Sequence, residues 1–219
     1  MSIAIVTDST ADLPKDVVEK HGITVVPLNV RFGMEEFKDG IDIDNDEFYR
    51  RLQIESELPT TSQPSLGDFI EVYRSLIAEH DGIVSIHISG KLSQTINSAV
   101  QGARDVDSDG EKIKPIDTGQ ATIPLGLIVI EAANAAASGA DLAGVVEAVD
   151  DAMSRARFYG MVDTLEYLVK GGRIGRASEM LGGLLRVKPL LSLTDGVVIP
   201  IGRVRTKQRA IEELLKRAA

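Results

Sequence analysis

Short apolar runs and amphipathic stretches alternate along the first 150 residues. Runs rich in β-branched side chains predict strands at residues 3–6, 23–32, 83–88 and 112–116. Helical periodicity predicts helices at residues 16–21, 45–52, 66–80, 123–137 and 142–153, and one more that follows residues 89–95 and ends near 103. Residues 58–65, which contain two prolines, are expected to form a loop. This alternation is typical of a mostly parallel sheet with helices on both faces.

The pattern changes after about residue 155. A strand is predicted at residues 158–162, a helical turn at 164–169 and a short helix at 177–185. Apolar strands at 189–194 and 197–203 flank Asp195-Gly196, the kind of dipeptide that a tight type I′ hairpin prefers, and a last helix begins near Lys207. We therefore expect an α/β fold with a parallel-sheet subdomain at residues 1–150 and a smaller α+β subdomain, containing an antiparallel hairpin, at 151–219.

Composition excludes several classes of function. The chain has 219 residues, of which 43% are hydrophobic and 26% charged, as is usual for a globular protein. It contains no cysteine, which excludes disulfides, thiolate metal sites and cysteine nucleophiles and fits a reducing compartment. Aromatic residues make up only 4%, so platforms for stacking nucleic-acid bases are poorly supplied.

Charge is divided unequally along the chain. Residues 1–150 hold 11 Lys and Arg against 26 Asp and Glu, a balance of −15, whereas residues 151–219 hold 13 against 7, a balance of +6. The last third could offer positive potential to an anionic ligand or an acidic partner, or its basic residues could simply be solvated. Nucleic acid is not expected as a partner, because the acidic first part would repel phosphate.

Targeting and membrane-spanning segments are not expected. The first eight residues have no basic region and already include Asp8, which argues against a signal peptide. The most apolar stretch, residues 121–137, is interrupted by Pro124, Glu131 and Asn134 and is shorter than the roughly 20 apolar residues that cross a bilayer. We therefore expect a cytoplasmic protein without membrane insertion.

Hydroxyl-rich segments follow two of the predicted strands. Residues 7–10 follow the first strand and residues 89–95 the third, while Thr60, Thr61 and Ser62 lie between two prolines. Ligands of parallel sheets collect at the carboxyl ends of strands, where helix N-termini favour anions. Each segment could instead only cap a helix. Because no base is adjacent, these hydroxyls indicate binding of a carboxylate or phosphate more than nucleophilic catalysis.

A glycine-rich basic segment occupies residues 170–176. It matches neither G-x-G-x-x-G nor a Walker A motif, and a helix end followed by a turn would explain the glycines. Arg173 within it could bind a carboxylate through two hydrogen bonds, and Arg203 and Arg205 add to the same positive field.

Histidine and acidic residues give little indication of a metal site. His87 lies within a predicted strand, where a hydrogen-bonded structural role is expected, and no pair of histidines has ligand spacing. The acidic residues Asp39, Asp42, Asp44 and Asp46 lack the terminal glutamate of a calcium loop, so they are interpreted as a solvated turn.

Five motifs in order along the chain resemble the DegV family. They are residues 5–14 (IVTDSTADLP), 59–65 (PTTSQPS), 88–95 (ISGKLSQT), 163–174 (DTLEYLVKGGRI) and 188–191 (KPLL) together with 202–206 (GRVRT). The resemblance covers essentially the whole chain. Members of the family continue for some tens of residues beyond its equivalent, so the second subdomain is expected to be incomplete relative to them. Gln94 departs from the family pattern, which more often has glycine there.

The resemblance implies a fatty-acid-binding protein with no catalytic residue, metal or cofactor of its own. The acyl chain would lie in an apolar tunnel between the subdomains, and a separate ATP-dependent fatty acid kinase would convert the presented carboxylate to an acyl phosphate for phospholipid synthesis. Thr61 and Ser93 match the hydroxyl contacts of the family and Arg173 the arginine near the head group. The candidate ligand-binding set is completed by Ser9, Ser62 and Thr95, and the candidate partner-binding residues are Arg176, Arg203 and Arg205. Candidates for the apolar wall, each of which could instead belong to the ordinary core, are Leu125, Leu127, Ile128, Leu181, Leu184 and Leu185.

Two other functions stay open. The first is a phosphotransfer or small-metabolite enzyme related to dihydroxyacetone-kinase-like domains, for which His87 is the strand-borne candidate for covalent chemistry. The second is a regulatory or adaptor protein that docks partners through its basic last third.

Overall fold

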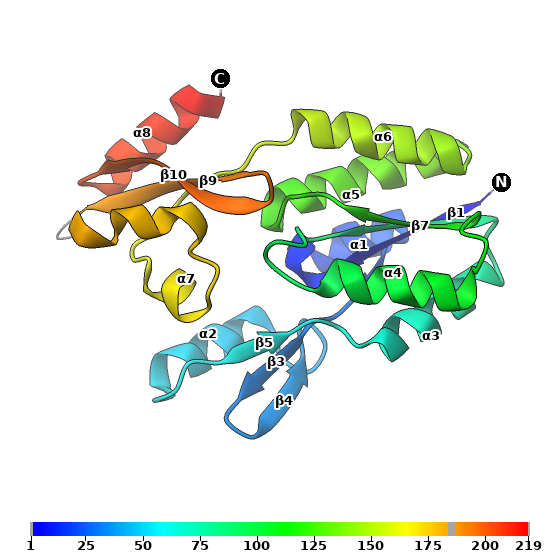
Figure 1. The fold of residues 1–219 in the computed structure, drawn as a ribbon, viewed down its shortest axis with the longest axis horizontal. Coiled ribbons are helices and arrows are strands. Elements are labelled where there is room, and N and C mark those ends of the chain that lie inside the picture. Colours follow the sequence, from blue (N-terminus) through cyan, green and yellow to red (C-terminus); the bar gives the residue numbers. More distant parts are fainter. Residues whose placement is uncertain (1, 184–186, 219) are drawn as a thin grey trace. The chain divides into compact units, whose positions relative to one another are not determined.

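The computed structural model describes residues 2–183 and 187–218 and divides the chain into two compact units (Figure 1). The first unit is residues 1–156 and the second is residues 157–219. The boundary expected near residue 150 lies inside a helix, α6 (Leu142–Arg155), because apolar side chains continue on its buried face as far as Ala152. The expected α/β fold class is confirmed.

A four-stranded parallel sheet forms the centre of the first unit. Its order is β2 (Thr24–Val26), β1 (Ile3–Asp8), β6 (Gly82–His87) and β7 (Ile113–Asp117). Every residue of β1 and β6 is buried, as expected for central strands that are covered on both faces.

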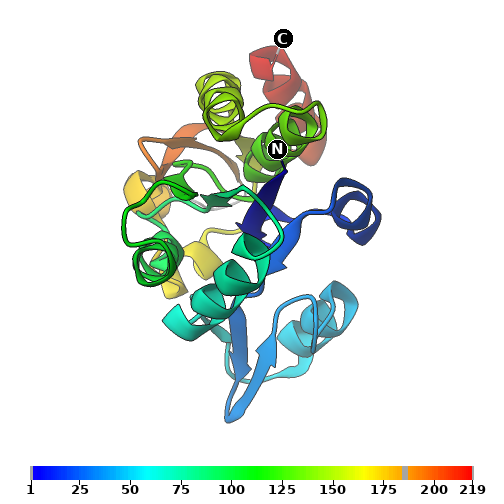
Figure 2. The same ribbon diagram turned by 90° about the vertical axis from the view of Figure 1, so that its right-hand side faces the viewer.

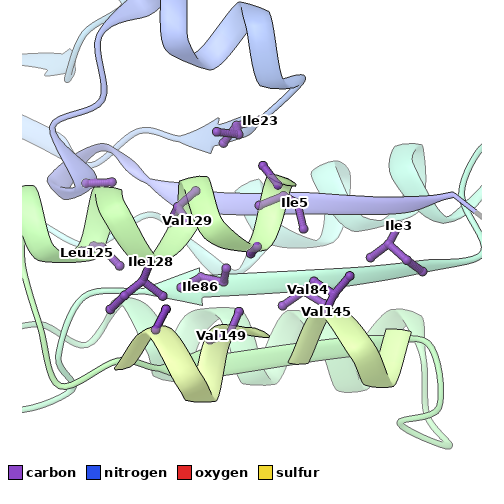
Figure 3. Close-up of a cluster of buried hydrophobic side chains, with 14 of the residues drawn as sticks. Ile3, Ile5, Ile23, Val84, Ile86, Leu125, Ile128, Val129, Val145 and Val149 are labelled. Atoms are coloured by element: carbon purple, nitrogen blue, oxygen red, sulfur yellow. The ribbon is translucent and has the colours of Figure 1, made fainter. Parts of the chain in front are cut away.

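Helices cover both faces of this sheet, and Figure 2 shows them on either side of the strands. On one face α5 (Thr122–Ala137) and α6 pack against Ile5, Val84 and Ile86 (Figure 3), with α1 (Lys15–His21) beside α5. On the other face α3 (Leu66–Ile77) and α4 (Thr95–Val106) surround a core that includes Phe69 and Tyr73. The predicted three-layer arrangement is therefore observed.

Local sequence sets where several helices start. Asp44 Oδ1 accepts the Glu47 N–H at 2.9 Å before α2 (Asn45–Ile54), and Asp141 Oδ1 accepts the Gly144 N–H at 2.8 Å before α6. Ser65 and Asp68 form a reciprocal capping box at α3. These caps satisfy N–H groups that have no partner within the helix. The role of Asp44 agrees with the interpretation of the acidic segment as a turn.

The segment between β2 and α3 differs from the prediction. The single strand expected at residues 23–32 is two strands in different sheets, β2 and β3 (Asn29–Phe32), because Pro27 has no N–H for a continuous ladder. β3 pairs with β4 (Glu35–Lys38), which was not predicted, and with β5 (Thr60–Ser62). The residues expected to form a loop at 58–65 thus contain an edge strand.

The second unit contains a three-stranded antiparallel sheet in the order β10 (Val197–Val204), β9 (Lys188–Thr194) and β8 (Tyr159–Met161). The predicted hairpin is confirmed: Asp195 and Gly196 have φ of 51° and 77°, as a type I′ turn requires. α7 (Glu166–Lys170) and α8 (Lys207–Ala218) match the expected helices. The helix expected at 177–185 is a 3₁₀ segment, η2 (Gly175–Gly183).

The leucines and isoleucine proposed for an apolar wall separate into distinct groups. Leu125 and Ile128 lie on the buried face of α5 and belong to the core, whereas Leu127 and Leu181 are exposed. Leu184 and Leu185 lie outside the described residues. Within the part of the chain that the structure describes, no helix is long and apolar enough to cross a membrane.

Asp107 closes the turn between α4 and β7 and gives a pH-dependent prediction. Its Oδ2 accepts the N–H groups of Lys112 and Ile113, each at 2.8 Å. Partial burial would raise the pKa of Asp107, but these hydrogen bonds and Lys114 hold it below 3.8. The carboxylate therefore stabilises the fold above pH 3.8, and this contribution is lost as pH falls through the lower pKa of the folded state.

We expect Asp107→Asn to lower the melting temperature at pH 7, and we expect the difference in melting temperature from wild type to narrow at pH 3. An equal difference at both pH values would contradict this.

Candidate functional site

The carboxyl ends of β1, β6 and β7 lie next to one another because these strands are parallel neighbours. β1 ends at Asp8, β6 at His87 and β7 at Asp117. Loops that leave this edge carry the hydroxyl-rich segments 7–10 and 89–95. The edge is thus where the rule for parallel sheets places a ligand.

Asp8 is a fully buried carboxylate that binds two loops. Its Oδ1 accepts the Thr10 N–H at 3.1 Å and the Thr10 hydroxyl at 2.5 Å. Its Oδ2 accepts the Ile88 N–H at 3.1 Å and lies 2.9 Å from His87 Nδ1. Burial alone would raise the pKa of Asp8, but His87, the Thr10 hydroxyl and the Ile88 N–H outweigh it, so the pKa lies below its usual value. Asp8 is therefore a stable anion inside the protein.

His87 continues this network into the core. Its Nε2 lies 2.7 Å from Ser85 Oγ, which in turn lies 2.8 Å from Tyr73 Oη. Burial raises the pKa of Tyr73, so its hydroxyl stays protonated. Phe69 meets the imidazole edge-on with ring centres 5.2 Å apart. Both ring nitrogens of a fully buried side chain are thus engaged, as predicted for a structural histidine, and His87 is poorly suited to covalent phosphotransfer.

The end of β7 anchors the loop that follows β6. The Thr118 hydroxyl donates to the His87 carbonyl at 2.8 Å, and the Ser89 N–H donates to the Gln120 carbonyl at 2.8 Å. Asp117 Oδ2 accepts the Gly90 N–H at 3.1 Å. The first residues of the loop are therefore hydrogen-bonded to the ends of both neighbouring strands, Ile88 to Asp8 of β1 and Gly90 to Asp117 of β7.

Three candidate hydroxyls lie at this edge. Ser9, in η1 (Ser9–Ala11), accepts the Leu28 N–H through its Oγ at 3.1 Å. Ser93 Oγ lies 2.8 Å from Thr95 Oγ1 and also accepts the Thr95 N–H at 3.3 Å. Thr95 is buried and Ser93 half-buried. Ser93 is therefore the more accessible hydroxyl of the pair at the start of α4.

Thr61 and Ser62 lie on β5 and are both exposed. Thr61 pairs with Val30 and Ser62 with Asn29, whose Nδ2 donates to Ser62 Oγ at 3.4 Å. Asn29 directly follows Leu28, whose N–H donates to Ser9. The pairing of Asn29 with Ser62 therefore brings the end of β5 near the residue that binds Ser9. Successive side chains of a strand point to opposite faces, so the structure separates these two candidates.

The candidate arginines belong to the second unit and are exposed. α7 ends in a glycine cap, where the Gly171 N–H donates to the Tyr167 carbonyl at 2.9 Å and the Arg173 N–H to the Leu168 carbonyl at 2.9 Å. This supports the alternative interpretation of the glycines as a helix end. Arg173 Nη1 donates to the Gly171 carbonyl at 2.5 Å. Arg176 lies in η2, Arg203 on β10 and Arg205 just after it.

The acidic residues do not assemble into a metal site in the described part of the chain, where no group of three or more His, Asp and Glu could hold an ion.

The sequence missed the network behind the hydroxyls. The motif at residues 5–14 includes Asp8, and the sequence predicts a hydrogen-bonded role for His87, but it does not pair these two residues, and Tyr73 and Ser85 are not among the predicted site residues. The available signal was position: Asp8 and His87 each end a mainly apolar run that predicts a buried strand, where a polar side chain must find a partner.

This fold occurs in a class of solved proteins described as binding fatty acids. "Fatty Acid Binding of a DegV family Protein from Thermus thermophilus" has a TM-score of 0.92 and 39% identity, and covers 99% of this chain and 76% of that chain. DegV from Bacillus subtilis, described as a fatty acid binding protein, has a TM-score of 0.87 and 34% identity, with 100% and 77% covered. A stearic acid-binding protein from Eubacterium ventriosum has a TM-score of 0.90 and 32% identity, with 99% and 75% covered.

The family match agrees with these structures. Residues 2–219 match the family described as "Uncharacterised protein, DegV family". The chain belongs to the DegV family, as its motifs predicted, and spans about three quarters of the length of these solved relatives.

Proposed function

We propose that this protein binds a long-chain fatty acid, with the carboxylate at the hydroxyl-bearing edge of the first unit. The observation that carries the proposal is the pair Ser93 and Thr95 at the carboxyl edge of the parallel sheet, at the N-terminus of α4. This placement, in a chain whose solved relatives are described as fatty-acid-binding, favours an anionic head group.

The energetics of such a ligand fit this set of residues. An acyl chain gains about 0.8 kcal/mol for each CH₂ that it buries, so the tail can supply most of the affinity. The head group then needs hydrogen-bond donors, because an unpaired buried charge would be costly. Ser9, Thr61, Ser62, Ser93 and Thr95 are candidate donors, and Arg173 is the candidate cation.

The direct test is to find the ligand. Purified protein is denatured and extracted with organic solvent, and the extract is compared by mass spectrometry with a mock purification. A fatty acid at about one equivalent, or uptake of added palmitate or oleate by the purified protein, is the expected result. A clean extract without uptake would overturn the proposal.

The opposite orientations of neighbouring residues on β5 allow a sharper test of the head-group site. Because Thr61, and not Ser62, matches the hydroxyl contact of the family, we expect Thr61→Val to weaken palmitate binding about tenfold or more, the cost of one hydrogen bond to a charged group, and Ser62→Ala to change it less than threefold. Ser93→Ala should resemble Thr61→Val. Isothermal titration calorimetry measures the affinity of all three variants. Ser75→Ala, at an exposed position on α3, is the control. Equal, small effects at Thr61 and Ser93 would show that the carboxylate binds elsewhere.

We further propose that the protein is a carrier that presents the bound carboxylate to a fatty acid kinase, without catalysis of its own. The basic residues Arg176, Arg203 and Arg205 are the candidate docking surface. Acyl phosphate should form only when kinase, ATP and the loaded protein are combined, and Arg203→Glu should slow this reaction while palmitate binding is unchanged. Phosphate release from ATP by the protein alone would contradict the carrier role.

A further inference from the structure

A buried chain of polar side chains links the core of the first unit to the loops of the candidate site. It runs from Tyr73 on α3 through Ser85 and His87 on β6 to Asp8 at the end of β1. All four side chains are fully buried, so solvent does not contribute to their hydrogen bonds. Such a network is stable only when each member is satisfied.

The carboxylate at one end of the path sets the direction of the first hydrogen bond. A carboxylate only accepts, so His87 Nδ1 carries a proton and donates to Asp8 Oδ2. His87 Nε2 and Ser85 Oγ, 2.7 Å apart, and Ser85 Oγ and Tyr73 Oη, 2.8 Å apart, form the other two hydrogen bonds. Each of the four side chains therefore has a partner within the network.

Asp8 is the point where this path meets the loops. Thr10 donates to it twice from the segment that carries Ser9, and Ile88 donates to it from the start of the loop that carries Ser93. These N–H groups lie beyond the ends of the regular strand ladders. One carboxylate therefore replaces the missing ladder partners on both loops.

We propose that Asp8 is a positioning residue for the head-group site, and that His87 holds its carboxylate in place. Asp8 fixes the segment with Ser9 and the loop with Ser93 relative to each other, while it is itself too buried to contact ligand. This inference rests on the proposed fatty-acid function, which it extends from the hydroxyls to the groups that orient them.

Two substitutions separate the two halves of the network. Asp8→Asn replaces one carboxylate oxygen by an NH₂ group, which then faces either the Thr10 donors or those of His87 and Ile88, so one loop loses its acceptor. His87→Asn retains an NH₂ group that can donate to Asp8, and it gives up the link to Ser85 and the ring contact with Phe69. A matched destabilising control is Val149→Ala, a cavity in the core on the opposite face of the sheet.

The first measurement is amide hydrogen exchange of the full chain, followed by mass spectrometry. Asp8→Asn should speed exchange at least fivefold in the peptides of the loop that faces the new NH₂ group, either residues 9–13 or residues 88–95. Val149→Ala should leave both segments within twofold of wild type. Unchanged exchange in both loops of the Asp8→Asn protein would overturn the proposal, and this readout does not depend on any ligand.

The second measurement is the affinity for palmitate at a temperature where circular dichroism shows all variants folded. Asp8→Asn should weaken binding about tenfold, whereas His87→Asn and Val149→Ala should stay within threefold. Equal losses in Asp8→Asn and Val149→Ala would reduce Asp8 to a stability role and overturn the proposal. If wild type itself binds no palmitate, the proposed function fails, and hydrogen exchange alone decides whether Asp8 orders the loops.

Discussion

Phe69→Ala is expected to lower the free energy of unfolding of the first unit by about 3–5 kcal/mol, the range for removing a buried aromatic side chain. Phe69 is fully buried between α3, α4 and the sheet. Its ring centre lies 5.7 Å from that of Tyr73 and 5.2 Å from that of His87. The substitution leaves a cavity beside the imidazole, because the strands and helices around it cannot collapse into the space.

Chemical denaturation monitored by circular dichroism measures this loss. Tyr49→Ala serves as the control, because Tyr49 is 60% exposed on α2 and its removal should cost less than about 1 kcal/mol. A loss below about 1.5 kcal/mol for Phe69→Ala would mean that the core on this face is loosely packed. Phe69→Leu, which refills part of the volume, should recover a part of the stability.

Gly126→Ala is expected to destabilise the protein by about 1–3 kcal/mol, although alanine is normally the better helix former. Gly126 lies near the start of α5, where the helix packs against η1. A Cβ atom there would lie 2.5 Å from the Ala11 carbonyl oxygen and 3.1 Å from Leu13 Cδ2. A backbone oxygen cannot rotate away, so α5 and the segment that carries Ser9 must move apart.

Gly67→Ala is the matched control for this effect. Gly67 also lies near the start of a helix, α3, but its Cβ would meet only Ser65 Oγ at 3.6 Å. Alanine should be neutral there or stabilise the helix by up to about 1 kcal/mol. Thermal melting of both variants tests the pair. Equal melting temperatures would show that η1 is not held against α5 as the structure has it.

These substitutions test the framework on which the candidate site depends. Phe69 supports His87 from one face of the sheet, and Gly126 allows α5 to approach η1 from the other. Because Asp8 is hydrogen-bonded to His87 and directly precedes η1, the edge with Ser9 and Ser93 is held from both faces. We therefore expect either substitution to weaken ligand binding as well as stability.

Local patterns in the sequence determined the class of fold. The parallel sheet, its covering helices and the hairpin at Asp195-Gly196 follow from periodicity, capping residues and turn dipeptides, each of which acts within a few residues. The motifs indicated the family for a similar reason, since each motif is a short run of neighbouring residues. These features could be predicted because the responsible residues are close together in the chain.

Other features depend on partners that are distant in the chain. Residues 23–32 have one continuous strand pattern, but pairing divides them between two sheets, and residues 60–62 become a strand only because β3 lies beside them. That pairing also turns Thr61 and Ser62 to opposite faces, although the sequence presents them as equivalent. Asp8 and His87 are 79 positions apart, and only the parallel register of β1 and β6 brings them to 2.9 Å. The sequence by itself thus determined the elements and the family, whereas the tertiary structure decided which polar side chains meet, because a buried hydrogen bond depends on spatial neighbours and not on sequence neighbours.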